Sequence, residues 1–212
     1  VGSEMCIRDS GERYARFAKK LCEHGYAVFA QDHIGHGKSV ASDDDLGYFG
    51  EKDGWRDFVI DCRSLTDIAR EEYPGKPVVF FGHSMGSFLL RTYLYTYPDA
   101  VDKAVISGTG WEDPMKVRMG KLVCKLEEAR IGEKNTSALV TKLMFGSYNR
   151  AFGPVTSPNA WICSDDAVVA AYDADPLCGF DATVGLARDL LTGVGMNEQQ
   201  ENLDKMNKQD LG

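Results

Sequence analysis

The sequence lacks the features that mark several classes of protein. No apolar run reaches the ~18–20 residues of a membrane-spanning helix, since the longest clean stretches are residues 78–81 and 168–171. The six cysteines include no Cys-x-x-Cys pair and have no zinc-ligand spacing. Residues 1–10 lack the apolar segment of a signal peptide. We therefore expect reduced thiols, no metal and a cytoplasmic location.

Basic residues are also in short supply. Lysine and arginine number 24 against 32 aspartate and glutamate residues, so the formal net charge is −8. An acidic chain is a poor partner for phosphate backbones, and we expect no nucleic-acid partner. With 212 residues, of which 43% are hydrophobic, the chain can bury roughly 70% of its unfolded surface without disulfides.

Up to about residue 107, apolar spacing indicates helices that alternate with strands. Intervals of three and four residues predict helices over residues 14–21, 55–69 and 87–97. Short apolar runs next to glycine and proline predict buried strands at residues 26–30, 77–81 and 101–106. Strands this far apart need crossover connections, so we expect an α/β fold with a mostly parallel sheet and helices on both faces.

Two polar residues in this part of the chain have expected local roles. Ser10 is placed to cap the first helix, and Gly25 lies where that helix should end. Asp32 opens a long loop rich in glycine, aspartate and serine, residues 32–50. We expect its carboxylate to fix this loop by accepting hydrogen bonds from backbone N–H groups.

After residue 110, helical patterns follow one another without a convincing strand. Residues 185–191 and 198–206 have the spacing of further helices. One apolar stripe in this region comprises Met119, Leu122, Val123 and Leu126. Such a stripe normally belongs to a core, but in a cap it could face an acyl chain or a membrane surface.

The sharpest local signal is the pentapeptide Gly82-His83-Ser84-Met85-Gly86. It follows a predicted strand and opens a predicted helix, which is the setting of a Gly-x-Ser-x-Gly nucleophile elbow. In so tight a turn the serine backbone is strained and its hydroxyl projects above the sheet edge. Side chains at positions 82 and 86 would collide, so glycine is expected there. The N–H of Met85, at the positive end of the helix, can stabilise an oxyanion.

Two further segments of the sequence are informative: residues 25–39 (GYAVFAQDHIGHGKS) and residues 80–87 (FFGHSMGS), together with residues 175–180 (DPLCGF). They resemble the monoacylglycerol lipase and lysophospholipase branch of the α/β-hydrolase superfamily, in which residues 175–180 would belong to a lid. The resemblance implies a Ser–Asp–His triad, an oxyanion hole and a helical cap over an acyl pocket. By that match Ser84 is the nucleophile and Met85 an oxyanion donor.

The same resemblance implies an organisation for the chain. Residues 11–110 are similar to the α/β-hydrolase core, residues 111–180 to a helical cap, and residues 181–212 to helices that return toward the core. Residues 1–10 do not resemble the family, and we interpret them as a junction or sequencing artefact. We therefore expect a fold that is incomplete at both ends.

Two departures from the family pattern concern the catalytic groups. The family order is serine, then aspartate, then histidine, but all four histidines, at positions 24, 33, 36 and 83, precede Ser84. The aspartate and histidine are therefore expected beyond residue 212, and the 212 residues alone to be inactive. A His-Gly pair that supplies the second oxyanion N–H in the family is replaced by Met5 and Cys6.

The remaining polar motifs point to structural roles. His83 is expected to pack or hydrogen bond rather than act as the base, because neighbouring side chains in this turn point apart. His33 and His36 have the spacing of metal ligands without a third ligand, so a loop role is expected. Residues 37–39 (Gly-Lys-Ser) resemble the end of a phosphate-binding loop, but position 32 is Asp rather than glycine. We expect no cofactor.

These observations favour a serine hydrolase of carboxylic esters, of the monoacylglycerol or lysophospholipid type. The alternative is a non-catalytic lipid-binding or interaction module that keeps the pocket without a triad. A haloalkane or epoxide hydrolase would need a carboxylate at the elbow, and Ser84 argues against it. The expected partner is a small apolar ester or lipid. Lys116, Arg118, Lys121 and Lys125 lie near the apolar stripe and suggest transient contact of the cap with an anionic membrane surface.

Overall fold

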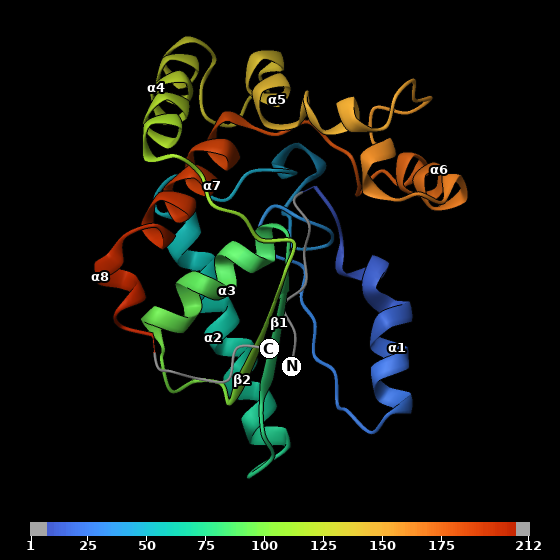
Figure 1. Ribbon diagram of the computed structural model, residues 1–212, viewed down its shortest axis with the longest axis vertical. Helices are drawn as coiled ribbons and strands as arrows, with labels where there is room; N and C mark the ends of the chain where they lie inside the picture. The colour runs from blue at the N-terminus through green and yellow to red at the C-terminus, as the bar shows by residue number, and fades with distance from the viewer. Residues whose placement is uncertain (1–7, 207–212) are drawn as a thin grey trace.

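The computed structural model describes residues 8–206 and centres on a parallel pair of strands. Strand β1 (Val79–His83) pairs with β2 (Lys103–Ser107), with Val79 opposite Lys103 and His83 opposite Ser107. Both strands run upward in Figure 1. Their parallel pairing confirms the predicted crossover, which is made by the helix between them.

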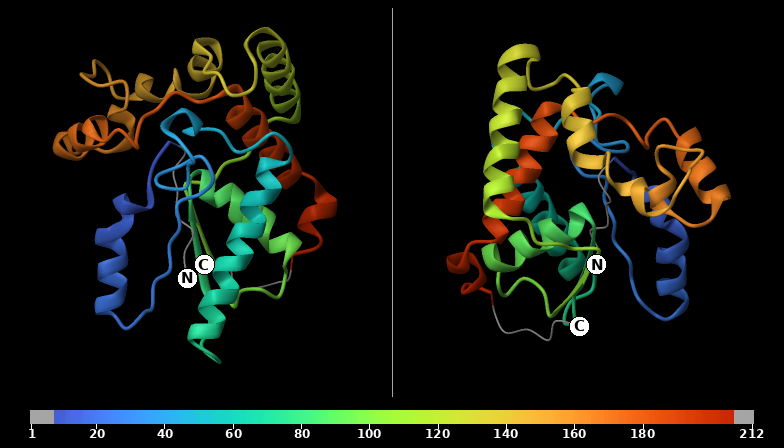
Figure 2. Two further views of the ribbon diagram at one scale, coloured as in Figure 1. Left: turned by 180° about the vertical axis from the view of Figure 1, so that it is seen from behind. Right: turned by 45° about the horizontal axis from the view of Figure 1, so that its top comes forward.

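Helices cover both faces of this sheet, as expected for an α/β fold. They are α1 (Ala15–Glu23), α2 (Gly54–Glu72) and α3 (Met85–Thr96). Successive side chains of β1 point to opposite faces. The Phe80 ring lies 5.1 Å from that of Tyr93 on α3, whereas the Phe81 ring lies 5.4 Å from that of Phe17 on α1. The sheet therefore separates α1 from α3, which Figures 1 and 2 show from three sides.

A row of helices crosses the strand ends from which α3 emerges (Figure 1). It consists of α4 (Pro114–Ile131), α5 (Ala138–Phe145) and α6 (Asp166–Ala174), with short 3-10 turns η3 (Tyr148–Ala151) and η4 (Ala160–Ile162). We call residues 114–174 the outer helical layer. Asp113, Ser137 and Asp165 cap its three α-helices, each accepting a hydrogen bond from a backbone N–H of the first turn.

Helix α7 (Val184–Asn197) runs between this layer and the core, and α8 (Gln200–Leu203) follows it (Figure 2). Helix α7 contacts α2 closely because Gly193 has no side chain: a Cβ there would lie 2.0 Å from Trp55 Cε2. The Trp55 indole N–H donates to Thr92 Oγ1 at 3.0 Å, and Thr92 Oγ1 donates to Asn197 Oδ1 at 2.9 Å. These bonds join α2, α3 and α7 into one buried unit.

Two local predictions in the first part of the chain differ from the structure. Residues 26–30 form no strand, because within the described part of the chain no backbone ladder pairs with them. Ser10 precedes the 3-10 turn η1 (Gly11–Tyr14) without a side-chain capping bond. Gly25 does follow α1 with a φ of 86°, which favours glycine and ends the helix as expected.

Of the two interpretations left open for the α4 stripe, the core interpretation is wrong for three of its four residues. Met119, Leu122 and Leu126 are 54%, 49% and 62% exposed. The face that α4 buries contains Val117 and Cys124 instead. It is turned this way because Gly120 lets α7 approach: a Cβ at Gly120 would lie 2.9 Å from Leu191 Cδ1.

Replacing Gly193 with alanine is expected to lower the free energy of unfolding by about 1–3 kcal/mol, because the added methyl group overlaps the Trp55 ring. Gly195→Ala is the matched control on the same helix, where the nearest atom, Val117 Cγ1, is 3.2 Å away. There the better helix propensity of alanine should hold the change within about 0.5 kcal/mol. Urea unfolding measures the stability of both variants, and equal unfolding midpoints for the two would contradict the packing argument.

Candidate active site

Ser84 lies between the last residue of β1 and the first residue of α3, in a strained backbone conformation. Its φ is 51° and its ψ is −119°, a region that residues with a Cβ rarely adopt. Its N–H donates to the Ser107 carbonyl oxygen at 2.9 Å. Its own carbonyl accepts from Ser87 N at 2.9 Å and from Ser87 Oγ at 2.6 Å. Hydrogen bonds to β2 and to α3 thus hold Ser84 in its strained conformation.

Gly82 makes the sharp turn sterically possible. A Cβ at this position would lie 2.4 Å from the Gly86 carbonyl oxygen and 3.0 Å from Leu90 Cβ. No side chain fits in that space, so α3 can fold back against β1 only with glycine at position 82. This is the collision that the Gly-x-Ser-x-Gly spacing predicts.

Met85 is the first residue of α3, and its side chain is 2% exposed. Its N–H belongs to the first turn of the helix, where N–H groups have no partner in the helical ladder. The helix dipole places further partial positive charge at this end of α3, next to Ser84. The geometry can therefore stabilise negative charge that develops beside the Ser84 hydroxyl.

His83 points away from Ser84, toward β2. Its Nδ1 lies 3.1 Å from Ser107 Oγ, and a Cβ at Gly108 would lie 3.0 Å from its Cε1. Burial, and then the nearby positive charge of Arg13, lower the pKa of this imidazole. In the described part of the chain, no histidine is hydrogen bonded to the Ser84 hydroxyl.

A cavity of about 500 Å³ opens above Ser84 and Met85, between the core and the outer helical layer. Its walls come from α3, α4, α5 and α7, and most of the lining is apolar. Besides Ser84 and Met85 it is lined by Phe88, Glu112, Lys116, Val117, Met119, Gly120, Val123, Leu143, Met144, Phe145, Tyr148, Leu190, Leu191 and Val194. Such a shape and chemistry suit an acyl chain.

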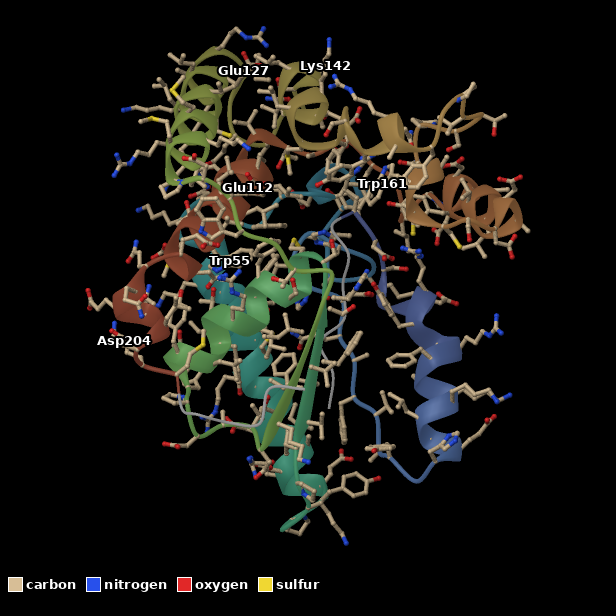
Figure 3. All side chains as sticks on the ribbon, in the orientation of Figure 1. Trp55, Glu112, Glu127, Lys142, Trp161 and Asp204 are labelled. Atoms are coloured by element: carbon tan, nitrogen blue, oxygen red, sulfur yellow. The ribbon has the colours of Figure 1, made fainter. Side chains whose placement is uncertain are left out.

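The charged side chains of the lining come from the first turn of α4 and from the residues just before it. Glu112 and Lys116 face each other with 3.9 Å between carboxylate and ammonium, and both are largely exposed. Figure 3 places Glu112 where the chain passes from the core to the outer helical layer. The cavity is therefore apolar inside and charged at this edge.

The walls from α3 and α7 were not identified in the sequence. Phe88, Leu190, Leu191 and Val194 all line the cavity. Their helical spacing was visible, yet the same spacing fits any core helix. Of the stripe on α4, Met119 and Val123 do line the cavity, which supports the alternative that the stripe faces an acyl chain.

The loop histidines are buried structural groups. His33 and His36 are both 0% exposed, and burial lowers the pKa of His33 to about 3 and that of His36 to about 4. The His33 ring stacks on Phe58, with 5.1 Å between ring centroids. Asp32 accepts from Gly11 N at 2.7 Å and from Lys38 N at 2.8 Å, so its predicted role in fixing the loop is confirmed.

Residues 8–206 contain no group of three or more histidine, cysteine, aspartate or glutamate side chains placed to hold a metal ion. The five cysteines within this range are free thiols, and Cys62, Cys124 and Cys178 are buried. Met5 and Cys6, which take the place of the expected second oxyanion donor, lie outside the described residues.

Replacing Ser84 with glycine is expected to raise the free energy of unfolding by about 1 kcal/mol, because glycine adopts this backbone conformation without strain. Ser84→Ala keeps the Cβ and should change the stability little. Ser87→Gly, inside α3, should instead lower it by about 1 kcal/mol. Urea unfolding of the three variants checks the order, and a Ser84→Gly protein less stable than Ser84→Ala would contradict the strain.

Comparison with known proteins places the chain in a family. Residues 7–207 match the family described as serine aminopeptidase, S33. The match begins within residues 1–10, where the structure buries Arg8, Asp9 and Ser10. A monoacylglycerol lipase of Mycolicibacterium smegmatis is 29% identical over 150 residues, which are 68% of this chain and 45% of that protein. The chain thus spans less than half the length of this relative.

Solved structures agree on the fold. A thermostable carboxyl esterase from Bacillus coagulans, in complex with glycerol, superimposes with a TM-score of 0.85 at 26% identity, over 97% of this chain and 67% of the esterase. A monoacylglycerol lipase from Paleococcus ferrophilus has a TM-score of 0.59 at 20% identity, over 92% of this chain and 66% of the lipase. The predicted α/β-hydrolase fold is confirmed, and the similarity to monoacylglycerol lipases agrees with the predicted branch. The chain belongs to the serine aminopeptidase S33 family of α/β-hydrolases.

Proposed function

We propose that the protein is a serine hydrolase of carboxylic esters and that Ser84 is its nucleophile. The observation that carries the proposal is the strained turn at Ser84, which opens into an apolar cavity of about 500 Å³. Strain of this kind persists where the surrounding structure enforces it, and it is common at active sites. A serine presented at the floor of an apolar cavity suits attack on an acyl ester.

The geometry suggests a sequence of steps. The Ser84 oxygen attacks the ester carbonyl carbon while a base takes the hydroxyl proton. The carbonyl oxygen becomes an oxyanion beside the Met85 N–H and the positive end of α3. The alcohol leaves with the proton that the base returns, and the acyl group stays on Ser84. Water then attacks the acyl-enzyme and releases the carboxylic acid.

The base is proposed to come from outside these 212 residues. His24 is exposed on α1, where its Nδ1 contacts the Lys20 carbonyl oxygen at 2.8 Å. His36 contacts the backbone of Arg8 and Ile34, and His83 contacts Ser107. With His33 stacked on Phe58, every histidine of the chain is engaged away from Ser84.

The substrate is proposed to be a monoacylglycerol or a lysophospholipid. Either lipid pairs one acyl chain with a polar headgroup, and the cavity pairs an apolar interior with charged Glu112 and Lys116. The Mycolicibacterium relative is named a monoacylglycerol lipase, and the Bacillus esterase holds glycerol. These names favour the monoacylglycerol over the lysophospholipid.

A fluorophosphonate probe is expected to label the full-length protein at Ser84 and to leave Ser84→Ala unlabelled. Hydrolysis of p-nitrophenyl butyrate should fall at least ~1,000-fold in Ser84→Ala, because the nucleophile is lost. Equal labelling of both proteins would overturn the assignment of Ser84. Fatty-acid binding without labelling or hydrolysis would instead favour the alternative, a non-catalytic lipid-binding module.

We also propose that the outer helical layer contacts anionic membrane surfaces transiently. Within residues 8–206, no helix has both the length and the apolar character needed to cross a bilayer. Helix α4 nevertheless exposes Met115, Met119, Leu122 and Leu126 next to the exposed cations Lys116, Arg118, Lys121 and Lys125. Apolar side chains flanked by lysines are typical of surfaces that lie on anionic lipid.

The double variant Leu122→Asp/Leu126→Asp is expected to bind anionic phosphatidylglycerol vesicles at least about fivefold more weakly in a sedimentation assay. Ile68→Asp is the matched control, because Ile68 is 47% exposed on α2, away from the outer helical layer. Equal sedimentation of the wild type and the double variant would contradict the proposal.

A further inference from the structure

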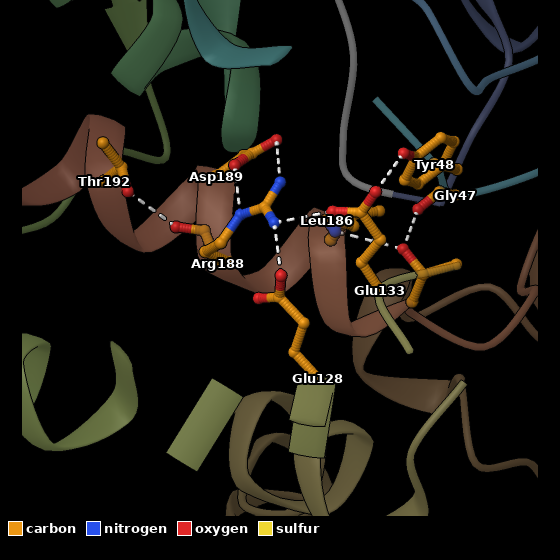
Figure 4. Close-up of polar contacts among 9 residues, drawn as sticks. Gly47, Tyr48, Glu128, Glu133, Leu186, Arg188, Asp189 and Thr192 are labelled. Atoms are coloured by element: carbon orange, nitrogen blue, oxygen red, sulfur yellow. Dashed lines mark hydrogen bonds and ion pairs between the residues drawn. The ribbon is translucent and has the colours of Figure 1, made fainter. Parts of the chain in front are cut away.

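Arg188 of α7 contacts three carboxylates near the C-terminal end of α4. Its Nη1 lies 2.8 Å from Glu133 Oε2 and 3.4 Å from Glu128 Oε1. Its Nε donates to Asp189 Oδ1 at 2.9 Å (Figure 4). One guanidinium therefore ties α7 to α4 and to the segment that follows it.

Glu133 extends this cluster to the core. Its Oε1 accepts from the Tyr48 hydroxyl at 2.6 Å (Figure 4). Burial disfavours the charged carboxylate, but hydrogen bonds from Tyr48 and Arg188 outweigh it and hold the pKa of Glu133 below its usual range. The neighbouring Lys134 ammonium lies 4.8 Å from the centroid of the Tyr48 ring and 3.2 Å from Asp45.

Backbone bonds reinforce the same junction. Gly185 N donates to the Glu133 carbonyl oxygen at 2.9 Å, and Val184 N donates to that of Asn135 at 3.0 Å. Thr136 and Thr183 form an antiparallel bridge. The segment that leaves α4 is thus fastened to the first turn of α7. We call the group Tyr48, Glu128, Glu133 and Arg188 the hinge clamp.

The helices that the hinge clamp joins are also two walls of the cavity. Val117, Met119, Gly120 and Val123 line it from α4, and Leu190, Leu191 and Val194 line it from α7. Arg188 precedes Leu190 by two positions on the same helix. The two helices approach closely at Gly120, where a Cβ would lie 2.9 Å from Leu191 Cδ1, so a small rotation of α4 would change this packing.

We propose that Arg188 is a positioning residue that sets the preference of the cavity for long acyl chains. This inference rests on the proposed esterase function. A short acyl group needs only the part of the cavity next to Ser84, whereas a long chain must contact the walls from α4 and α7 along its length. Loss of the hinge clamp frees α4 to move away from α7 and therefore weakens the binding of long chains selectively.

The test compares kcat/KM of the full-length protein for p-nitrophenyl laurate and p-nitrophenyl butyrate. In Arg188→Met the laurate-to-butyrate ratio is expected to fall about tenfold, through a higher KM for laurate, with butyrate changed less than about twofold. Arg188→Lys, which keeps the charge without the guanidinium fork, should recover part of the ratio. An unchanged ratio, or an equal loss for both esters, would overturn the proposal.

Arg130→Met is the matched control. Arg130 also pairs with a carboxylate, Glu127, but both residues belong to α4, so that pair does not join two helices. Its laurate-to-butyrate ratio should equal that of the wild type, and a fall as large as that of Arg188→Met would overturn the role of the hinge clamp. If Arg188→Met does not fold, Glu133→Gln and Tyr48→Phe test the same contacts, and their ratios should fall at least about threefold.

A binding assay separates this proposal from the proposed function. In a Ser84→Ala background, Arg188→Met is expected to bind a fluorescent dodecanoic acid about tenfold more weakly than its parent, as measured by fluorescence anisotropy. Equal affinities would overturn the role of Arg188 even if Ser84 proves to be the nucleophile. Weaker binding in a protein that hydrolyses neither ester would support the role of Arg188 while the esterase function fails.

Discussion

The backbone of Ser84 is the constraint on which the arrangement of the site depends. A residue with a Cβ is held at a φ of 51° because β2 accepts its N–H and α3 donates to its carbonyl oxygen. Those bonds require α3 to start immediately after β1 and to cross back over it, and only glycine at position 82 leaves room for that crossing. The strain therefore fixes three things together: the direction of α3, the place of the Met85 N–H and the exposure of the Ser84 hydroxyl.

Much of this could be predicted from the sequence, because the signals are local. The Gly-x-Ser-x-Gly spacing predicts the turn, the apolar runs predict β1 and β2, and intervals of three and four residues predict α2 and α3. Asp32 was identified for the same reason, since an aspartate at the start of a glycine-rich loop has backbone N–H groups within reach.

What could not be predicted depends on contacts between distant segments. Residues 26–30 have strand composition, but a strand also needs a hydrogen-bonded neighbour, and composition does not supply one. The stripe on α4 was left between a core face and an exposed cap face, because periodicity identifies an apolar face without identifying what covers it. The hinge clamp joins residues 48, 128, 133 and 188, whose proximity exists only in the folded chain.

Helix α7 contributes to the buried unit with Trp55 and Asn197, to the hinge clamp through Arg188, and to the cavity through Leu190, Leu191 and Val194. This limits how the fold can be recombined. A chimera that exchanges residues 111–180 between relatives would combine a foreign α4 with the resident α7, so Arg188 and its partners Glu128 and Glu133 would come from different parents. The smallest cassette that keeps both walls of the cavity together extends through residue 197.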